Sequence, residues 1–200
     1  MMKIQLKRIL HTLTIAGSMA LISACAELAI ATVAITTVDI IHDRRTTGEY
    51  FDDSGIELEM KKFLLSSKRL RSQTHINTIS YNGILLLTGE VNSEALKQEV
   101  ADYANRVYGV RQVVDEVRIA GKTAFLSRTS DTWITSKVKT ALLAKMKTKA
   151  NQMKVVTEYG TVYLMGIVTE EEANRATEIA RSIGGVVRVV RVFEIRVFNT

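Results

Sequence analysis

The residues of this chain that could do chemistry are few and lie far apart in the sequence. Its three histidines are His11, His42 and His75, and its only cysteine is Cys25. The spacings His-x-x-His, Cys-x-x-Cys and Gly-x-Ser-x-Gly do not occur, so the sequence indicates neither a metal site nor an activated nucleophile. Three glutamates at 170–172 begin a helical segment, where negative charge complements the helix dipole. We therefore expect no catalytic residue and no metal.

Cys25 follows a segment with the pattern of a secretory signal. Lys3, Lys7 and Arg8 precede an apolar run over 9–22, and Ile22-Ser23-Ala24-Cys25 closes the segment with small residues. This ending resembles a bacterial lipobox, in which the cysteine receives diacylglycerol and an acyl chain and becomes the mature N-terminus. We expect residues 1–24 to be removed as a signal peptide. The alternative is a free thiol at the end of an uncleaved helix.

The residues after Cys25 indicate where the mature chain resides. Two or more acyl chains hold a protein stably on a bilayer, and the position after the cysteine is Ala26 rather than aspartate. That pattern resembles sorting to the outer membrane, so we expect a lipid-anchored protein on its periplasmic face with no other cofactor. The apolar segment 26–41 is interrupted by Glu27 and Asp39, and spanning a bilayer needs about 20 apolar residues. We expect 25–45 to be a lipidated linker that lies on the membrane surface or packs along the first domain.

The charge of the mature chain is concentrated in its C-terminal part. The full sequence has 27 basic and 21 acidic residues, and three of the basic residues lie in 1–24. Residues 55–119 carry nine basic and eight acidic groups, whereas 123–200 carry twelve and seven. An anionic partner is therefore expected to meet the second half.

The chain contains one sequence pattern twice. Residues 82–91 return as 159–168, so that Gly83 and Gly160 lie 77 positions apart, as do Gly89 and Gly166. A period this long indicates two copies of a small domain, which we place at 46–120 and 124–198 with a join at 120–123. Copies of about 65–75 residues are near the lower size limit for a sufficient core. We therefore expect the copies to pack against each other.

Each copy has the order helix, strand, strand, helix, strand. Asn82-Gly83 predicts a two-residue hairpin, and Asp53 or Ser54 would cap the first helix, with Glu57 completing a capping box. Such a copy forms a three-stranded mixed sheet with both helices on one face, an α+β fold. The expected strands are 75–81, 84–91, 110–119, 154–158, 161–168 and 186–197; the expected helices begin at 53 or 54, at 92 or 93, at Asp131 (to about Lys145) and at 170 (to 183).

The repeated frame of hairpin glycine, Gly-x-Val, helix and Gly-Val-x-x-Val resembles the BON domain. With the lipobox and the stretch 131–139, residues 43–197 resemble the dual-BON outer-membrane lipoproteins of Gram-negative division sites. The resemblance implies a non-enzymatic protein that binds anionic phospholipid and helps maintain envelope integrity. The copies differ where Val107-Tyr108-Gly109 stands against Ile183-Gly184-Gly185.

The helix that begins near Asp131 carries the candidate phospholipid-binding residues. Trp133 falls about 100° from Ile134 and so lies off the core stripe. Tryptophan prefers the bilayer interface, and lysines beside it can meet anionic headgroups. The predicted contact residues are Trp133, Lys137, Lys139 and Leu143, whereas the first copy has Gly55 in place of Trp133. The alternatives are that Trp133 is buried against the neighbouring domain and that the lysines at 145, 147, 149 and 154 form a solvated loop.

Three functions are compatible with these patterns. The first is a lipid-anchored module that binds anionic phospholipid through the second copy. The second is an interaction scaffold for envelope proteins, which would dock on the same patch or on the strand at 186–197. The third, nucleic-acid binding, is disfavoured because a signal segment removes the protein from the cytoplasm. We adopt the first.

Overall fold

The computed structural model describes residues 43–120 and 125–198, which belong to one compact unit, Asp43–Thr200. The signal segment, Cys25, the apolar segment 26–41 and most of the join lie outside the described residues. Both domains, their cores and the contacts described between them lie inside Asp43–Thr200, so we expect residues 43–200 to fold as a unit.

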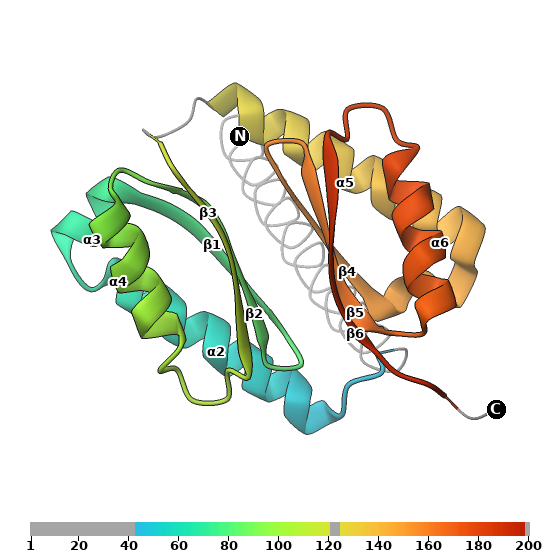
Figure 1. The fold of residues 1–200 in the computed structure, drawn as a ribbon, viewed down its shortest axis with the longest axis horizontal. Coiled ribbons are helices and arrows are strands. Elements are labelled where there is room, and N and C mark those ends of the chain that lie inside the picture. Colours follow the sequence, from blue (N-terminus) through green and yellow to red (C-terminus); the bar gives the residue numbers. More distant parts are fainter. Residues whose placement is uncertain (1–42, 121–124, 199–200) are drawn as a thin grey trace, which may run out of the picture. The chain divides into compact units, whose positions relative to one another are not determined.

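The first domain contains three helices and three strands (Figure 1). They are α2 (Thr47–Leu65), α3 (Lys68–Gln73), β1 (Thr74–Tyr81), β2 (Ile84–Val91), α4 (Glu94–Ala104) and β3 (Gln112–Ile119). The short helix α3 was not expected from the sequence. It begins at the N-cap Ser67, whose side chain accepts a hydrogen bond from the N–H of Leu70.

The second domain repeats this order with a 3-10 segment in place of α3. Its elements are α5 (Phe125–Met146), η1 (Lys147–Gln152), β4 (Met153–Glu158), β5 (Thr161–Val168), α6 (Glu170–Arg181) and β6 (Arg188–Ile195). In both sheets the middle strand pairs antiparallel with the strand before it and parallel with the strand after the helix. Each domain thus has a three-stranded mixed sheet with its helices on one face (Figure 1), which confirms the α+β prediction.

The middle strands are buried on both faces, which explains their unbroken apolar runs. In β2, Leu85 and Leu87 face the helices of the first domain, while Leu86 faces the other way into a third core. In β5, Leu164 faces its own helices and Met165 joins the same third core. Alternate residues of each strand therefore serve a domain core and an interface between the domains, and the predicted packing of the two copies is confirmed.

Two ion pairs at the edge of this interface each join an arginine of one domain to a glutamate of the other. Arg111 lies 2.6 Å from Glu194, and Arg188 lies 2.5 Å from Glu116. The two arginines are not equivalent in the repeats, because the residue that donates its backbone N–H to the hairpin glycine is Arg111 in the first domain and Val187 in the second. Each domain thus supplies a cation to the other, but the two contacts are not related by the repeat.

The helix starts predicted from Asp53, Ser54 and Asp131 are wrong. Helix α2 begins six residues earlier, where Thr46 and Glu49 form the capping box, and α5 already begins at Phe125. The sequence Ser54-x-x-Glu57 matches the capping pattern only locally, because Glu57 accepts instead from the N–H of Ser80 and from Lys154.

Asp53 and Asp131 are buried inside their helices, where they hold the hairpin turns. Asp53 accepts the N–H groups of Asn82 (2.6 Å) and Gly83 (2.9 Å), and Asp131 accepts those of Tyr159 and Gly160, both at 2.8 Å. These turns have positive φ at both central residues, such as 52° at Asn82 and 72° at Gly83. Such a turn suits the twist of a hairpin but leaves its N–H groups for an outside acceptor. The helix supplies that acceptor.

The segment before α2 is fastened to both domains. Arg44 donates to the carbonyl of Ile167 (3.0 Å) and to the carboxylate of Glu172 (2.6 Å) in the second domain. Arg45 pairs with Asp53 at 2.7 Å in the first domain, and its guanidinium lies 4.0 Å from the centre of the Tyr81 ring. The chain that arrives from the N-terminus therefore enters the described structure at the seam between the domains.

Candidate functional site

Helix α5 is fixed in rotation by its buried side. Ile134, Val138, Leu142 and Met146 recur at helical spacing and pack in the core of the second domain against β4, β5 and α6. The opposite side is exposed to solvent. Its residues with described side chains are Thr132, Trp133, Ser136, Lys139, Thr140, Leu143 and Ala144.

Two large apolar side chains stand on this exposed side. Trp133 is 66% exposed and Leu143 is 49% exposed. The alternative interpretation, that Trp133 is buried against the neighbouring domain, is therefore wrong, because the domains meet through the opposite face of the sheet. An exposed indole beside polar groups has the amphipathic character that favours a membrane interface.

The two predicted lysines differ in their surroundings. The Nζ of Lys137 donates to the carbonyl of Gly184 at 2.6 Å and lies 5.8 Å from the centre of the Trp133 ring. Lys137 is thus half-buried and supports the indole with a cation–π contact. Lys139 is exposed and has no ion-pair partner among the described residues. The structure brings all four predicted residues to one side of α5. Of the two lysines, Lys139 is the more available to an anion, because Lys137 is engaged by Gly184 and Trp133.

The loop after α6 adds a residue that the sequence reasoning did not select. Val187 is 82% exposed, and its N–H donates to the carbonyl of Gly160 at 2.8 Å. The loop runs close to α5, because a Cβ on Gly185 would lie 3.2 Å from the side chain of Ile134. The sequence Gly184-Gly185 was a signal for this close approach, whereas the exposure of Val187 depends on the tertiary structure.

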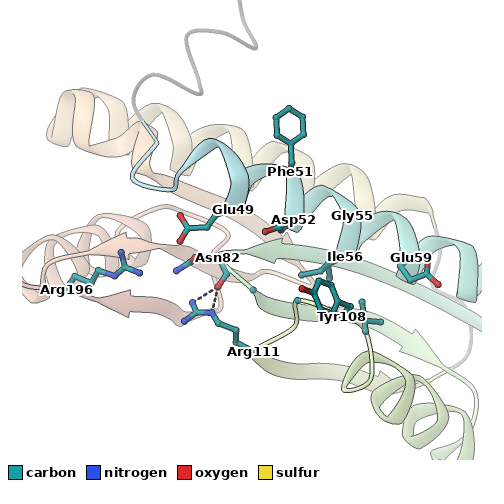
Figure 2. Close-up of a pocket in the computed structure, with 13 residues that line it drawn as sticks. Glu49, Phe51, Asp52, Gly55, Ile56, Glu59, Asn82, Tyr108, Arg111 and Arg196 are labelled. Carbon is teal, nitrogen blue, oxygen red and sulfur yellow. Dashed lines mark hydrogen bonds between the residues drawn. The ribbon is translucent and has the colours of Figure 1, made fainter.

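The first domain has a cavity in place of the exposed tryptophan (Figure 2). The cavity measures about 720 Å³ and is lined by Gly55, the equivalent of Trp133, together with Asn82, Gly109 and Arg111. Tyr108 at its edge is 97% exposed. Figure 2 shows Glu49, Asp52 and Glu59 along α2, with Arg111 and Arg196 on other elements. The two domains therefore present different surfaces at equivalent places.

No group of three histidine, cysteine or carboxylate side chains in the described ranges could hold a metal ion. Within those same ranges, no helix combines the length and the apolar character needed to cross a membrane.

Comparison with known proteins gives the same domain architecture. The BON domain model matches residues 52–121 and again 130–197. The outer membrane lipoprotein DolP of Haemophilus influenzae is 35% identical over 152 residues, which cover 76% of this chain and 79% of that protein. The 21 kDa hemolysin of Actinobacillus pleuropneumoniae is 33% identical over 75% of this chain and 77% of its own length. The osmotically-inducible protein Y of Escherichia coli is 33% identical, with 70% of each chain covered.

Proposed function

This chain belongs to the BON domain family, and from that premise we propose that it is an outer-membrane lipoprotein that binds anionic phospholipid through its second domain. It is held on the periplasmic face by acyl chains on Cys25 and supports envelope integrity at division sites, without enzymatic activity. The exposed side of α5 is the lipid-binding surface, with Trp133, Lys137, Lys139 and Leu143 in contact with the membrane.

The observation that carries this proposal is the exposure of Trp133 on a helix whose other side is locked into a core. An indole that is 66% exposed next to a lysine is not part of the core of either domain, so core packing does not account for its presence. At a bilayer interface its ring reaches the headgroup level, and the adjacent lysines meet anionic lipids. The single copy of this feature makes lipid binding a property of the second domain alone.

The location of the protein is supported by two independent features. The pattern around Cys25 is that of a lipidation site, and the relative from Haemophilus influenzae is itself named an outer membrane lipoprotein. A fluorescent fusion of the full chain, observed during division, tests the division-site part.

The substitution Trp133→Glu tests the contact surface. Residues 43–200 lack both Cys25 and the apolar segment 26–41, so any vesicle binding by this form comes from the domains. We expect Trp133→Glu to abolish co-flotation with vesicles that contain phosphatidylglycerol, while circular dichroism and the urea midpoint stay unchanged. The matched control is Tyr108→Glu, which places the same charge on an even more exposed aromatic residue of the first domain.

Normal flotation of a folded Trp133→Glu protein would contradict the assignment of α5. Equal loss in both variants would show that a single added charge, wherever it lies, prevents binding, and it too would count against a specific surface.

A second function, as a scaffold for envelope proteins, is favoured by the cavity of the first domain. Its volume of about 720 Å³, its acidic groups on α2 and the exposed Tyr108 at its edge would suit a peptide with a basic and an apolar side chain. The edge strand β6 offers a further docking place, since it pairs only with β5. Failure of residues 43–200 to bind any vesicle would favour this function over the first.

A further inference from the structure

Another cavity lies in the second domain, where α5 ends. It measures about 250 Å³ and brings together side chains from the end of α5, from η1 and from the first turns of α6. Four of its residues are cationic and two are carboxylates. The lining consists of Lys145, Met146, Lys147, Lys149, Glu171, Glu172 and Arg175.

The backbone at the end of α5 is shaped to gather these cations. Lys147 has a φ of 52°, which ends the helix and turns the chain into η1. Across the cavity, Arg175 of α6 donates to the carbonyl of Lys145 at 2.9 Å. Arg175 thus occupies a carbonyl that the end of a helix would otherwise leave unpaired, and its cation is held at the cavity.

The carboxylates do not neutralise the cavity. Glu172 is already shared between Arg44 at 2.6 Å and Lys149 at 3.1 Å. Burial raises its pKa, but hydrogen bonds from Arg44, Thr169 and Lys149 outweigh this and lower it to about 2, so Glu172 is anionic and occupied. Lys145 and Lys147 are exposed and have no ion-pair partner among the described residues. The lining therefore has an excess of positive charge, with free ammonium groups able to bind an anion.

The cavity lies at the C-terminal end of α5, on the side that faces α6, and Lys147 brings it near the exposed side of α5. Leu143 lies ten residues after Trp133, about 15 Å along the helix axis, and Lys147 follows one turn later. The exposed residues Ser136, Thr140 and Ala144 lie along the same side. A bilayer that meets both Trp133 and Leu143 would therefore come near Lys147, just past the end of the helix.

The N-terminal segment arrives at the same end of the domain. Arg44, among the first described residues, shares the carboxylate of Glu172 with Lys149, which lines the cavity. The tether from the lipidated end of the chain thus joins the folded part beside this cavity.

We propose that this cavity binds the phosphate of an anionic phospholipid headgroup and so forms a second membrane contact, at the opposite end of α5 from Trp133. The proposal rests on the proposed function, since it takes α5 as the membrane-facing helix. Lys145 and Lys147 supply the contacts to phosphate oxygens, and Arg175 adds a guanidinium held in place by the end of α5. The lysine series is then a binding site and not only a solvated loop.

The double substitution Lys145→Gln/Lys147→Gln tests this site in residues 43–200. A basic side chain near an anionic surface contributes about five-fold to binding, so we expect roughly thirty-fold weaker flotation with phosphatidylglycerol vesicles at low salt. The control is Lys61→Gln/Lys68→Gln, which removes two exposed lysines from the first domain and should change binding less than two-fold. Unchanged flotation of the first variant, with loss in Trp133→Glu, would overturn the cavity and leave the proposed function standing.

A titration followed by amide NMR signals separates lipid headgroup from free phosphate and does not depend on vesicle binding. We expect the signals of Lys147 and Arg175 to shift with dispersed short-chain phosphatidylglycerol and not with inorganic phosphate at equal concentration. Equal shifts with both would overturn the lipid assignment in favour of a free-phosphate site. No shift with either ligand would overturn the cavity site, whatever the outcome of the vesicle experiments.

Discussion

Asp53 and Asp131 show how one residue type at one place in each repeat organises the fold. Both carboxylates lie inside a helix, where aspartate has low propensity, and both accept two N–H groups from a hairpin turn. Asp53 makes two further contacts, because it also pairs with Arg45 and accepts a hydrogen bond from the hydroxyl of Ser80. The two clamps are therefore equivalent in geometry but not in energy.

Removal of each clamp should destabilise the protein to a different degree. Asp131→Ala leaves two turn N–H groups without their acceptor, and we expect a loss of about 2–4 kcal/mol in the free energy of unfolding. Asp53→Ala also removes one of the two carboxylates paired with the buried guanidinium of Arg45, so its loss should be larger, about 3–5 kcal/mol. Urea denaturation measures both.

The control for these variants is Asp52→Ala, at an exposed neighbour of Asp53 that should stay within about 0.5 kcal/mol. An Asp131→Ala protein as stable as Asp52→Ala would show that the clamp does not support the hairpin.

The two lysines of the lipid-binding surface should be separable by fluorescence, because Trp133 is the only tryptophan. Lys137→Gln removes the cation beside the indole, so it should change the emission of the free protein. Lys139→Gln should leave that emission unchanged but weaken binding to phosphatidylglycerol vesicles about five-fold at low salt. Identical spectra for wild type and Lys137→Gln would contradict the cation–π contact.

At the scale of elements, Gly89 of β2 and Gly55 of α2 differ in whether their positions can accept a side chain. Gly89 has a φ of 109°, and a Cβ there would lie 2.0 Å from the carbonyl oxygen of His75. Gly55 lies within a helix with nothing within 4 Å of a Cβ. We expect Gly89→Ala to lower the free energy of unfolding by about 2 kcal/mol or more, and Gly55→Ala to raise it by about 0.5–1 kcal/mol. Thermal unfolding of the two variants measures this, and destabilisation by both would show that Gly55 has a packing role not visible in the structure.

The sequence predicted the sheet better than the helix starts. Asn82-Gly83 and the apolar run of 84–91 set the hairpin and the bounds of β2, because turn geometry and burial on both faces act locally. The first helix was misplaced because Ser54-x-x-Glu57 imitates a cap, while Asp53 is needed by a turn about 30 residues away. Such a long-range demand cannot be seen in a local motif.

The candidate site was predictable because it depends on helical spacing within α5. The cavities were not, because they depend on contacts between distant parts of the chain. The spacing of Ile134, Val138 and Leu142 fixes which side of α5 is buried, and hence the exposure of Trp133. The headgroup cavity instead combines Lys145 with Arg175, 30 residues apart, through a hydrogen bond that only the packing of α6 creates. The lysine series was visible in the sequence, but its partner was not.

At the scale of the whole molecule, Arg44 links the N-terminal segment to the second domain through Glu172. The pKa of this carboxyl is lowered from 4.5 to about 2, so its contribution to stability is complete above about pH 4.5 and is lost as the pH falls towards 2. We expect the urea midpoint of the wild type to fall through this range and that of Glu172→Gln to fall less. A parallel fall in both proteins would show that other carboxyl groups carry the acid sensitivity.

The pairing of the two domains leaves their outer surfaces free to differ. A shared core and ion pairs such as Arg111–Glu194 and Arg188–Glu116 join them, while the second domain exposes Trp133 and the first has a cavity at Gly55. This difference between two copies of one fold is compatible with one copy that faces the membrane and another that remains available to a partner.

Co-flotation of residues 43–200 with vesicles that contain or lack phosphatidylglycerol, at low and high salt, tests the central claim most directly. The account predicts flotation that requires the anionic lipid and weakens as salt increases, because lysines provide part of the attraction and salt screens them. Absence of flotation with every vesicle at low salt would contradict the claim and leave lipidation of Cys25 as the proposed membrane contact.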